Sequence, residues 1–165
     1  MKEKMKHYAK EIVLFSVVMI LFANLLSLYR SMDLNKEPLQ EYHFTLIDNE
    51  HYSVDTTKPL LIHFWATWCP TCRVEADTIE YLSKHFEVLT IAVKSGSNQE
   101  LQNFMQEQGY TFRVLNDAEG RYARKYLVSG FPTSFIYNKK QEHIFSDVGY
   151  TSLLGMYLRL WWANL

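Results

Sequence analysis

The chain has 165 residues, with 17 lysines and arginines against 18 aspartates and glutamates, which gives a formal net charge of −1 at pH 7. A balance this close to zero, with no basic block after the first residues, argues against nucleic acid as a partner. About 135 residues remain once an apolar N-terminal segment is set aside, and that length fits one domain.

The N-terminal segment has the pattern of a membrane anchor. Residues 12–29 are 18 positions without a charge, and a helix needs about 17–25 residues to cross a bilayer. Lysines at positions 2, 4, 6 and 10 keep the N-terminus cytoplasmic by the positive-inside rule, so the chain after Arg30 is exported. We therefore predict a cytoplasmic N-terminus (1–10), a transmembrane anchor (11–30), a short stalk (31–40) and one domain (41–165).

Two other interpretations of this segment are a cleaved signal peptide and a buried core helix. A cleaved signal peptide has a similar charged start, but its apolar region usually runs only about 7–15 residues and ends in a small-x-small site. Here the run is longer, and Leu21-Phe22-Ala23 lacks the small residue at the first position. A buried core helix is disfavoured because the segment is apolar on every face. We favour an uncleaved anchor, with cleavage as the open alternative.

The remaining chain alternates strand and helix patterns. Predicted strands cover residues 42–47, 52–54, 60–66, 88–93, 112–115, 134–137 and 142–145, and predicted helices cover 75–85, 99–108, 119–127 and 152–162. The continuous apolar run 60–66 suits a central strand that is covered on both faces. Asn98 is expected to cap the second of these helices and Gly109 to end it. Strand–helix alternation followed by a hairpin predicts an α/β sandwich with a mixed sheet.

The only two cysteines, Cys69 and Cys72, come directly after the run 60–66. A Cys-x-x-Cys pair that follows a buried strand is typical of a thioredoxin-like redox motif. If a helix begins there, Cys69 lies at its N-terminus, where free N–H groups and the helix dipole favour the thiolate that attacks disulfides. Cys72, one turn further on, is placed to resolve the mixed disulfide that results.

Other uses of the two thiols have weaker support. Structural zinc wants about four Cys or His ligands, yet there is no second Cys-x-x-Cys and the six histidines are scattered. A structural disulfide would close too short a loop to remove much chain entropy. Copper(I) binding stays open, because thiolates are the soft ligands that copper(I) prefers.

Two segments together resemble the thioredoxin superfamily, specifically its membrane-anchored, TlpA-like periplasmic branch. They are Phe-Trp-Ala-Thr-Trp-Cys-Pro-Thr-Cys-Arg-Val-Glu at 64–75 and Gly-Phe-Pro-Thr at 130–133, and the resemblance covers 41–165. Closest in pattern are cytochrome-c-maturation reductants and small anchored oxidoreductases of copper-tolerance systems. The resemblance implies a thioredoxin-like fold and a thiol–disulfide oxidoreductase of protein substrates. It also implies a single-pass protein of the bacterial inner membrane, with its domain in the periplasm and without cofactor or metal.

The same resemblance assigns roles to residues around the cysteines. It implies a redox disulfide between Cys69 and Cys72, and a cis peptide before Pro132 in a loop that faces the pair. Such a loop leaves backbone groups free to pair with an extended substrate. Trp68, Phe131 and Thr133 are the substrate-binding residues expected on this basis.

Two titratable residues raise the question of proton transfer. Glu75 lies one helical turn after Cys72 and matches an active-site glutamate of some TlpA-like reductants, where a carboxylate raises a thiol pKa or moves protons. The alternative for Glu75 is a solvated helix face. His63 stands at the strand position where thioredoxin carries a buried acid, and we favour a neutral core histidine over a proton shuttle. Ala76-Asp77 stands where relatives often have a kinking proline.

The direction of exchange depends on the reduction potential, which spans ~ −270 to −120 mV in such proteins. We lean towards a reductase or isomerase, which requires a membrane thiol-electron transporter as its redox partner, whereas an oxidase would need a quinone-linked one. A thiol peroxidase that uses Cys69 is one alternative. A copper-binding protein is another, for which His143 is the candidate third ligand.

Overall fold

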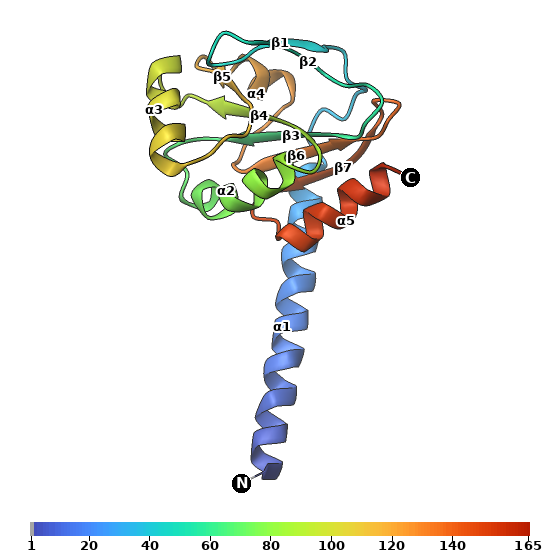
Figure 1. Ribbon diagram of the computed structural model, residues 1–165. Coiled ribbons are helices and arrows are strands. Elements are labelled where there is room, and N and C mark those ends of the chain that lie inside the picture. The colour runs from blue at the N-terminus through green and yellow to red at the C-terminus, as the bar shows by residue number, and fades with distance from the viewer. Residues whose placement is uncertain (1) are drawn as a thin grey trace.

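A five-stranded sheet with the order β5-β4-β3-β6-β7 lies at the centre of the computed structural model, which describes residues 2–165 (Figure 1). Its strands are β3 (Leu60–Trp65), β4 (Glu87–Val93), β5 (Val114–Asp117), β6 (Thr133–Tyr137) and β7 (His143–Val148). β3 pairs in parallel with β4 and antiparallel with β6, so the sheet is mixed, as predicted. Every residue of β3 is buried, which explains why its side chains are apolar apart from His63.

Helices and a hairpin cover the two faces of the sheet. Apolar side chains of α2 (Pro70–Ser83), α3 (Asn98–Gln108) and α5 (Leu153–Ala163) pack into one core cluster. The other face is covered by α4 (Arg121–Lys125) and by the antiparallel pair β1 (His43–Thr45) and β2 (His51–Ser53). This layered arrangement is the predicted thioredoxin-like α/β fold.

Several predicted boundaries are wrong by a few residues. The cap of α3 is Ser97 rather than Asn98: the Ser97 hydroxyl accepts from the Glu100 N–H while the Glu100 carboxylate accepts from the Ser97 N–H, which forms a capping box. Gly109 ends α3 in the left-handed conformation, as predicted. β5 begins two residues late, and α4 begins only after Gly120, whose φ of 69° closes a turn on Asp117.

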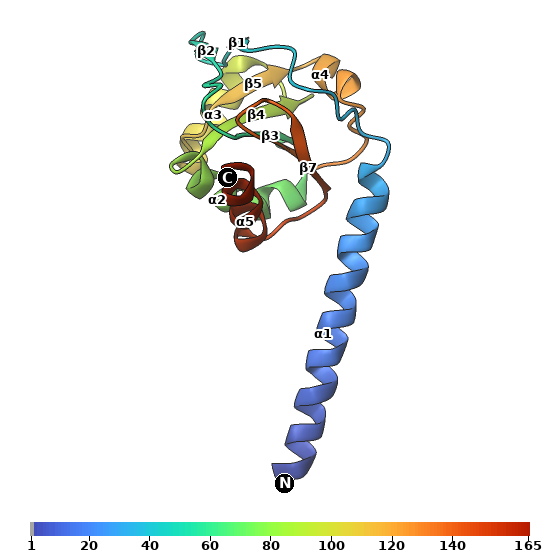
Figure 2. The ribbon, with the colours of Figure 1, turned by 90° about the vertical axis from the view of Figure 1, so that its right-hand side faces the viewer.

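Helix α1 (Lys2–Ser31) projects away from the sheet (Figures 1 and 2). Its segment Lys10–Ser31 is, by length and composition, the one candidate membrane span in the described part of the chain, with a mean hydropathy of 2.4. The last turns of α1 contact β7, where the Val148 N–H donates to Ser27 Oγ over 3.1 Å. The C-terminal end of α1 is therefore packed on the domain.

Residues 31–40, the predicted stalk, pack along the domain. Leu34 and Leu39 are buried in the core cluster that faces α4. The Asn35 N–H donates to the Tyr126 carbonyl, and the Leu39 N–H donates to the Gln141 carbonyl. Two leucines in a polar stretch carry too little periodicity to predict this packing. The segment runs along the domain and is part of its hydrophobic core.

Candidate active site

Both cysteines lie where β3 gives way to α2. Cys69 is the N-cap of α2 in an extended conformation, and Pro70 is the first helical residue. Sγ of Cys69 accepts a hydrogen bond from the Cys72 N–H at 3.2 Å, and the two residues form a disulfide with their Cα atoms 5.3 Å apart. After reduction, the Cys69 sulfur therefore lies beside a free N–H group and the positive end of the helix dipole, both of which stabilise a thiolate.

Trp68 forms one wall beside the disulfide. Its side chain is 57% exposed, whereas the cysteines are only 5% and 3% exposed. The indole N–H donates to the Lys94 carbonyl over 3.1 Å, and the ring packs edge-on against Phe131 with 5.6 Å between centroids. Trp68 is thus an exposed aromatic surface held in a defined place next to the sulfurs.

The loop before β6 reaches the same place because of the strand register. Thr133 pairs with Phe64 near the end of β3, so the residues before Thr133 lie beside the start of the cysteine motif. The Phe131–Pro132 peptide bond is cis, the conformation that the resemblance implies. The Pro132 carbonyl accepts from the Gly149 N–H over 2.8 Å, which ties the loop to the chain that follows β7.

A hollow of about 370 Å³ adjoins the two aromatic residues. Its lining is mainly apolar and consists of Trp68, Val93, Lys94, Gly120, Ala123, Arg124, Val128 and Phe131. Of the three residues expected to bind substrate, Trp68 and Phe131 line this hollow, which we call the Trp68 groove. Thr133 does not: its side chain is 1% exposed and donates to the Gly130 carbonyl. The contribution of α4 to the groove had no signal in the sequence.

Glu75 is not on a solvated helix face. Its side chain is completely buried on the side of α2 that faces the sheet, and one carboxylate oxygen accepts from the Thr151 N–H over 2.7 Å. The other oxygen, Oε2, lies 3.9 Å from Nε2 of His63 and has no hydrogen-bond partner among the described residues. The structure thus brings the two titratable residues together in the interior.

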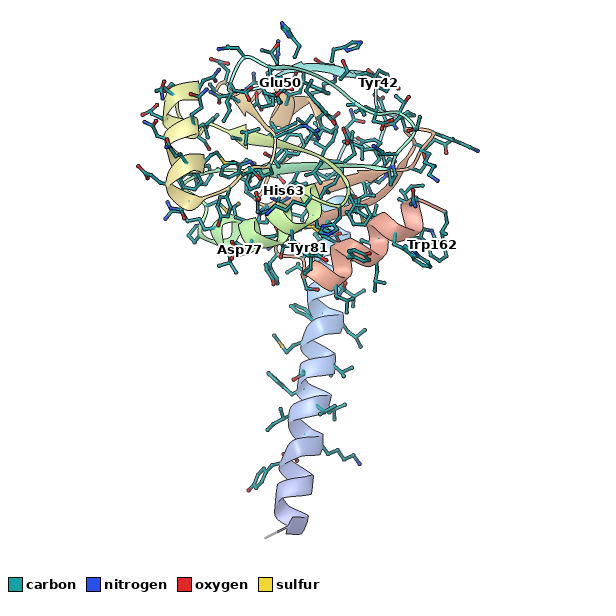
Figure 3. The ribbon with its side chains drawn as sticks, in the orientation of Figure 1. Tyr42, Glu50, His63, Asp77, Tyr81 and Trp162 are labelled. Carbon is teal, nitrogen blue, oxygen red and sulfur yellow. A yellow bond between two sulfur atoms is a disulfide. The ribbon has the colours of Figure 1, made fainter. Side chains whose placement is uncertain are left out.

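His63 is held by its second ring nitrogen. Nδ1 lies 2.9 Å from the hydroxyl of Ser134, the residue that pairs with His63 across β3 and β6. Figure 3 shows His63 between β3 and α2. Neither Ser134 nor Thr151 was predicted as part of the site, because each reaches it through contacts between segments more than 70 residues apart.

Burial shifts the pKa values of both residues in the direction that favours their uncharged forms. Desolvation raises the pKa of Glu75 to about 8, opposed by the Thr151 hydrogen bond and assisted by the negative charge of Asp147. Desolvation also lowers the pKa of His63 to about 3. At pH 7 the pair therefore consists mainly of a protonated carboxyl and a neutral imidazole.

His143 does not join the cysteines. It pairs with Tyr137, four residues along β6 from Thr133, which is roughly 13 Å of strand. Its ring packs edge-on against Phe135 and Tyr137. In residues 2–165, no group of three or more His, Cys, Asp or Glu side chains is arranged to hold a metal ion. The structure therefore does not bring His143, the candidate third ligand of the copper-binding alternative, together with the cysteines.

Comparison with known proteins gives the same picture. The family model described as AhpC/TSA family matches residues 35–142. A thioredoxin-like protein of Haemophilus influenzae is 30% identical over 133 residues, which is 80% of this chain and 78% of that one. The thiol-disulfide oxidoreductase ResA of Bacillus subtilis is 29% identical over 68% of this chain and 69% of its own.

A solved structure shares the fold. A thiol:disulfide interchange protein of the thioredoxin family from Chlorobium tepidum superposes with a TM-score of 0.65, over 78% of this chain and 97% of that one. Its sequence identity to this chain is 24%, so the likeness concerns the fold alone.

Proposed function

The chain belongs to the AhpC/TSA family of thioredoxin-like proteins and is a thiol–disulfide oxidoreductase, and we propose that it exchanges disulfides with protein substrates through Cys69 and Cys72. The observation that carries this proposal is the disulfide at the N-cap of α2 beside the Trp68 groove. An exposed aromatic wall next to a thiol pair suits an extended polypeptide better than a small solute.

In the reducing direction, the Cys69 thiolate attacks one sulfur of a substrate disulfide. A Cys69–substrate disulfide forms, and the second substrate sulfur leaves as a thiolate that takes up a proton. Cys72 then loses its proton, attacks Cys69 Sγ and closes the Cys69–Cys72 disulfide, which releases the first substrate sulfur. The first substrate sulfur then also takes up a proton. The substrate thus gains two electrons from the cysteine pair and two protons, one of them lost by Cys72 and the other from solvent, because Cys69 reacts as a thiolate. The oxidising direction is the reverse.

Glu75 is the group placed to handle the proton of Cys72. It lies one turn along α2 from Cys72 on the same buried side of the helix. A carboxyl group with a pKa of about 8 both gives and takes a proton near neutral pH. His63, within 3.9 Å, is the neighbour that biases where this proton lies. The ionised form of Glu75, which is the minor form at pH 7 and grows as the pH rises towards 8, therefore takes the role of proton acceptor in the resolving step.

The protein works as an anchored enzyme in this proposal. Residues 11–30 span the inner membrane, residues 1–10 are cytoplasmic, and the domain lies in the periplasm. The packing of α1 supports an uncleaved anchor, because the Ser27 hydroxyl accepts a hydrogen bond from the Val148 N–H and the last turns of α1 contact β7, so cleavage after the apolar run would remove part of a packed interface. Electrons come from a membrane thiol-electron transporter, and the domain acts as a reductase or isomerase, with cytochrome c maturation or copper tolerance as its setting.

The groove makes a prediction about substrate affinity. Phe131→Ala removes one aromatic wall of the Trp68 groove, and loss of such a contact typically costs about 1–2 kcal/mol of binding, or roughly a 5- to 30-fold rise in KM for a protein disulfide. Steady-state reduction of a protein disulfide by the full chain measures it. Val74→Ala is the matched control, because Val74 is 70% exposed on α2 and lies outside the groove. An unchanged KM for Phe131→Ala contradicts the groove as a substrate site.

The direction of disulfide exchange in the cell is tested by the redox state of Cys69 and Cys72. We expect alkylation of intact cells to trap Cys69 and Cys72 mainly as thiols if the protein is a reductant, and mainly as the disulfide if it is an oxidant. Turnover of hydrogen peroxide without a disulfide substrate would instead indicate a thiol peroxidase.

A further inference from the structure

Helix α5 is apolar on the side that faces away from the protein as well as on the side that faces the core. Met156, Leu160 and Ala163 are buried against the sheet. The opposite side exposes large apolar side chains, namely Leu154, Leu158, Trp161, Trp162 and Leu165, which we call the α5 face. Figure 3 shows Trp162 on the outer side of α5. Soluble surfaces rarely carry such a continuous apolar patch unless something covers it.

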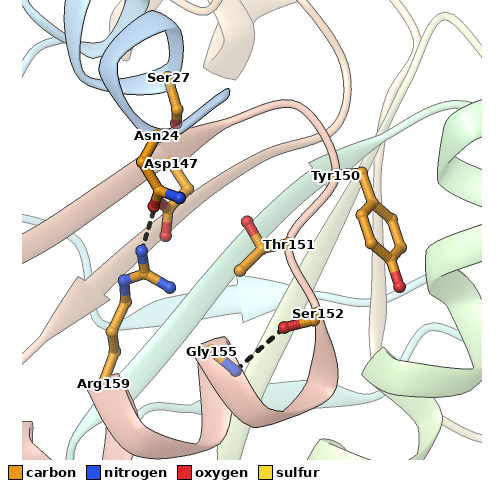
Figure 4. A pocket seen from close by; sticks show the side chains of 8 residues that line it. All are labelled: Asn24, Ser27, Asp147, Tyr150, Thr151, Ser152, Gly155 and Arg159. Atoms are coloured by element: carbon orange, nitrogen blue, oxygen red, sulfur yellow. Dashed lines mark hydrogen bonds and ion pairs between the residues drawn. The ribbon is translucent and has the colours of Figure 1, made fainter. Parts of the chain in front are cut away.

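The position of α5 relative to α1 identifies what covers this face. α5 lies at the end of the domain from which α1 leaves (Figures 1 and 2). A pocket of about 300 Å³ lies between the two helices, with Asn24 and Ser27 of α1 on one side and Ser152, Gly155 and Arg159 on the other (Figure 4). α5 is therefore level with the outer end of the candidate span Lys10–Ser31.

The depth of α5 follows from helix geometry. The candidate span ends at Ser31, so depth in the membrane is counted from there. Ser27 and Asn24 lie four and seven residues before Ser31, which is about 6 and 10 Å along the helix axis at 1.5 Å per residue. Amphipathic helices that lie in a membrane surface bury their apolar face about 5–10 Å into the boundary between headgroups and acyl chains. The depth of Asn24 and Ser27, which lie across the pocket from α5, therefore agrees with the depth at which such helices lie.

Charge and residue type fit the same location. Arg159 is the only charged side chain within α5, and it is paired with Asp147 over 3.2 Å on the side of the pocket. The exposed side carries Trp161 and Trp162, and tryptophan is enriched where the membrane meets water because its ring is apolar and its N–H is polar.

We propose that the α5 face lies in the lipid–water interface of the membrane that α1 spans. This inference rests on the proposed anchor. With α1 packed on β7 and α5 resting on the lipid, the domain is held at two places, and the cysteine pair is presented to membrane-embedded partners at a constant height and orientation. The contact is apolar, so neutral phosphatidylcholine is sufficient and anionic lipid is not required.

The test uses the full chain in phosphatidylcholine vesicles, with and without lipids brominated on the acyl chain. We expect brominated lipid to quench tryptophan emission, and the double variant W161F/W162F to lose most of the quenched component. W68F is the matched control and retains it, because Trp68 lies at the active site. The quenching stays unchanged at high salt, since no exposed charge of α5 contributes to the contact.

A second pair of variants tests the α5 face. Leu158→Glu places a charge at a 52% exposed position of the face, and we expect a several-fold loss of quenching. Leu127→Glu alters a similarly exposed leucine, 58%, directly after α4 on the other face of the sheet, and leaves quenching unchanged.

Separate readouts distinguish the possible failures. Vesicle flotation after alkaline washing reports the anchor, and disulfide exchange reports the cysteines. Unquenched Trp161 and Trp162 in chains that float would overturn the proposal for α5 alone. Crosslinked dimers with the same unquenched tryptophans would show that a second copy covers the face, which also overturns it. Chains that do not float overturn the anchor and this inference together, whether or not exchange activity remains.

Discussion

Cys69→Ala is expected to abolish disulfide exchange, with a loss of roughly 10³-fold or more, the scale on which removal of a catalytic nucleophile acts. Cys69 holds the N-cap of α2, where its sulfur accepts the Cys72 N–H. Cys72 has no equivalent place, because it lies within the first turn of α2 rather than at its N-cap. An incoming substrate sulfur therefore meets the better stabilised thiolate at Cys69.

Cys72→Ala is expected to fail at a different step. Its Cys69 thiolate still attacks a substrate disulfide, so one mixed disulfide forms per chain, but turnover stops because nothing resolves it. A Cys72→Ala chain that no longer turns over but still forms the mixed disulfide would distinguish the attacking role of Cys69 from the resolving role of Cys72. Reduction of a protein disulfide, followed over single and multiple turnovers, measures both variants, with Val74→Ala as the control on the same helix. Equal single-turnover rates for Cys69→Ala and the parent chain would contradict the assignment.

Glu75→Gln is expected to raise the free energy of unfolding at alkaline pH. The pKa of Glu75 is raised from 4.5 to about 8 in the folded chain, so folding favours the protonated carboxyl. That contribution to stability is fully present below pH 4.5 and is lost as the pH rises through 8. At pH 7 the loss is about 3 kcal/mol, at 1.36 kcal/mol per pH unit. The neutral amide of glutamine does not incur this loss.

His63 has the opposite dependence. Its pKa is lowered from 6.5 to about 3, so its contribution is present above pH 6.5 and is lost as the pH falls through 3. Between about pH 4.5 and 6.5 the two slopes oppose each other and largely cancel. We expect the parent chain to be most stable across this interval, and the stability gain of Glu75→Gln to grow from pH 5 to pH 8.

Denaturant unfolding of the oxidised full chain in detergent at pH 5, 7 and 8 measures this difference. Asp77→Asn is the matched control, because Asp77 is two residues further along α2 and exposed. The same Glu75→Gln chain should resolve its mixed disulfide roughly 10²-fold more slowly, since proton transfer by a side chain contributes on this scale. A variant with parental stability at pH 8 and a parental resolving rate would show that Glu75 is an ordinary buried carboxyl.

The sequence predicted the sheet well because β3 is buried on both faces. A strand in that position has no polar side, so its side chains are almost all apolar, His63 excepted, and the run is easily found. The residues at which helices begin were harder to predict from the sequence. Ser97 and Asn98 are both good capping residues, and only the Glu100 side chain, which reaches back to Ser97, decides between them.

Sequence periodicity predicts the burial of Glu75 but not its contact with His63. Glu75 shares a helix face with Cys72, Ile79 and Leu82, at spacings of three, four and seven residues, so its burial could have been predicted from the periodicity. Its contact with His63 could not. That contact requires α2 to lie over β3 at a particular angle, which tertiary packing determines.

The most direct test of Cys69 as the attacking thiol is the mapping of a trapped intermediate. The Cys72→Ala chain is reduced, mixed with a protein that contains one disulfide, quenched with acid and analysed by mass spectrometry of its peptides. We predict a single mixed disulfide between Cys69 and a substrate cysteine. If no mixed disulfide forms while Cys69 remains a free and alkylatable thiol, Cys69 is not the attacking group and the proposed mechanism is wrong.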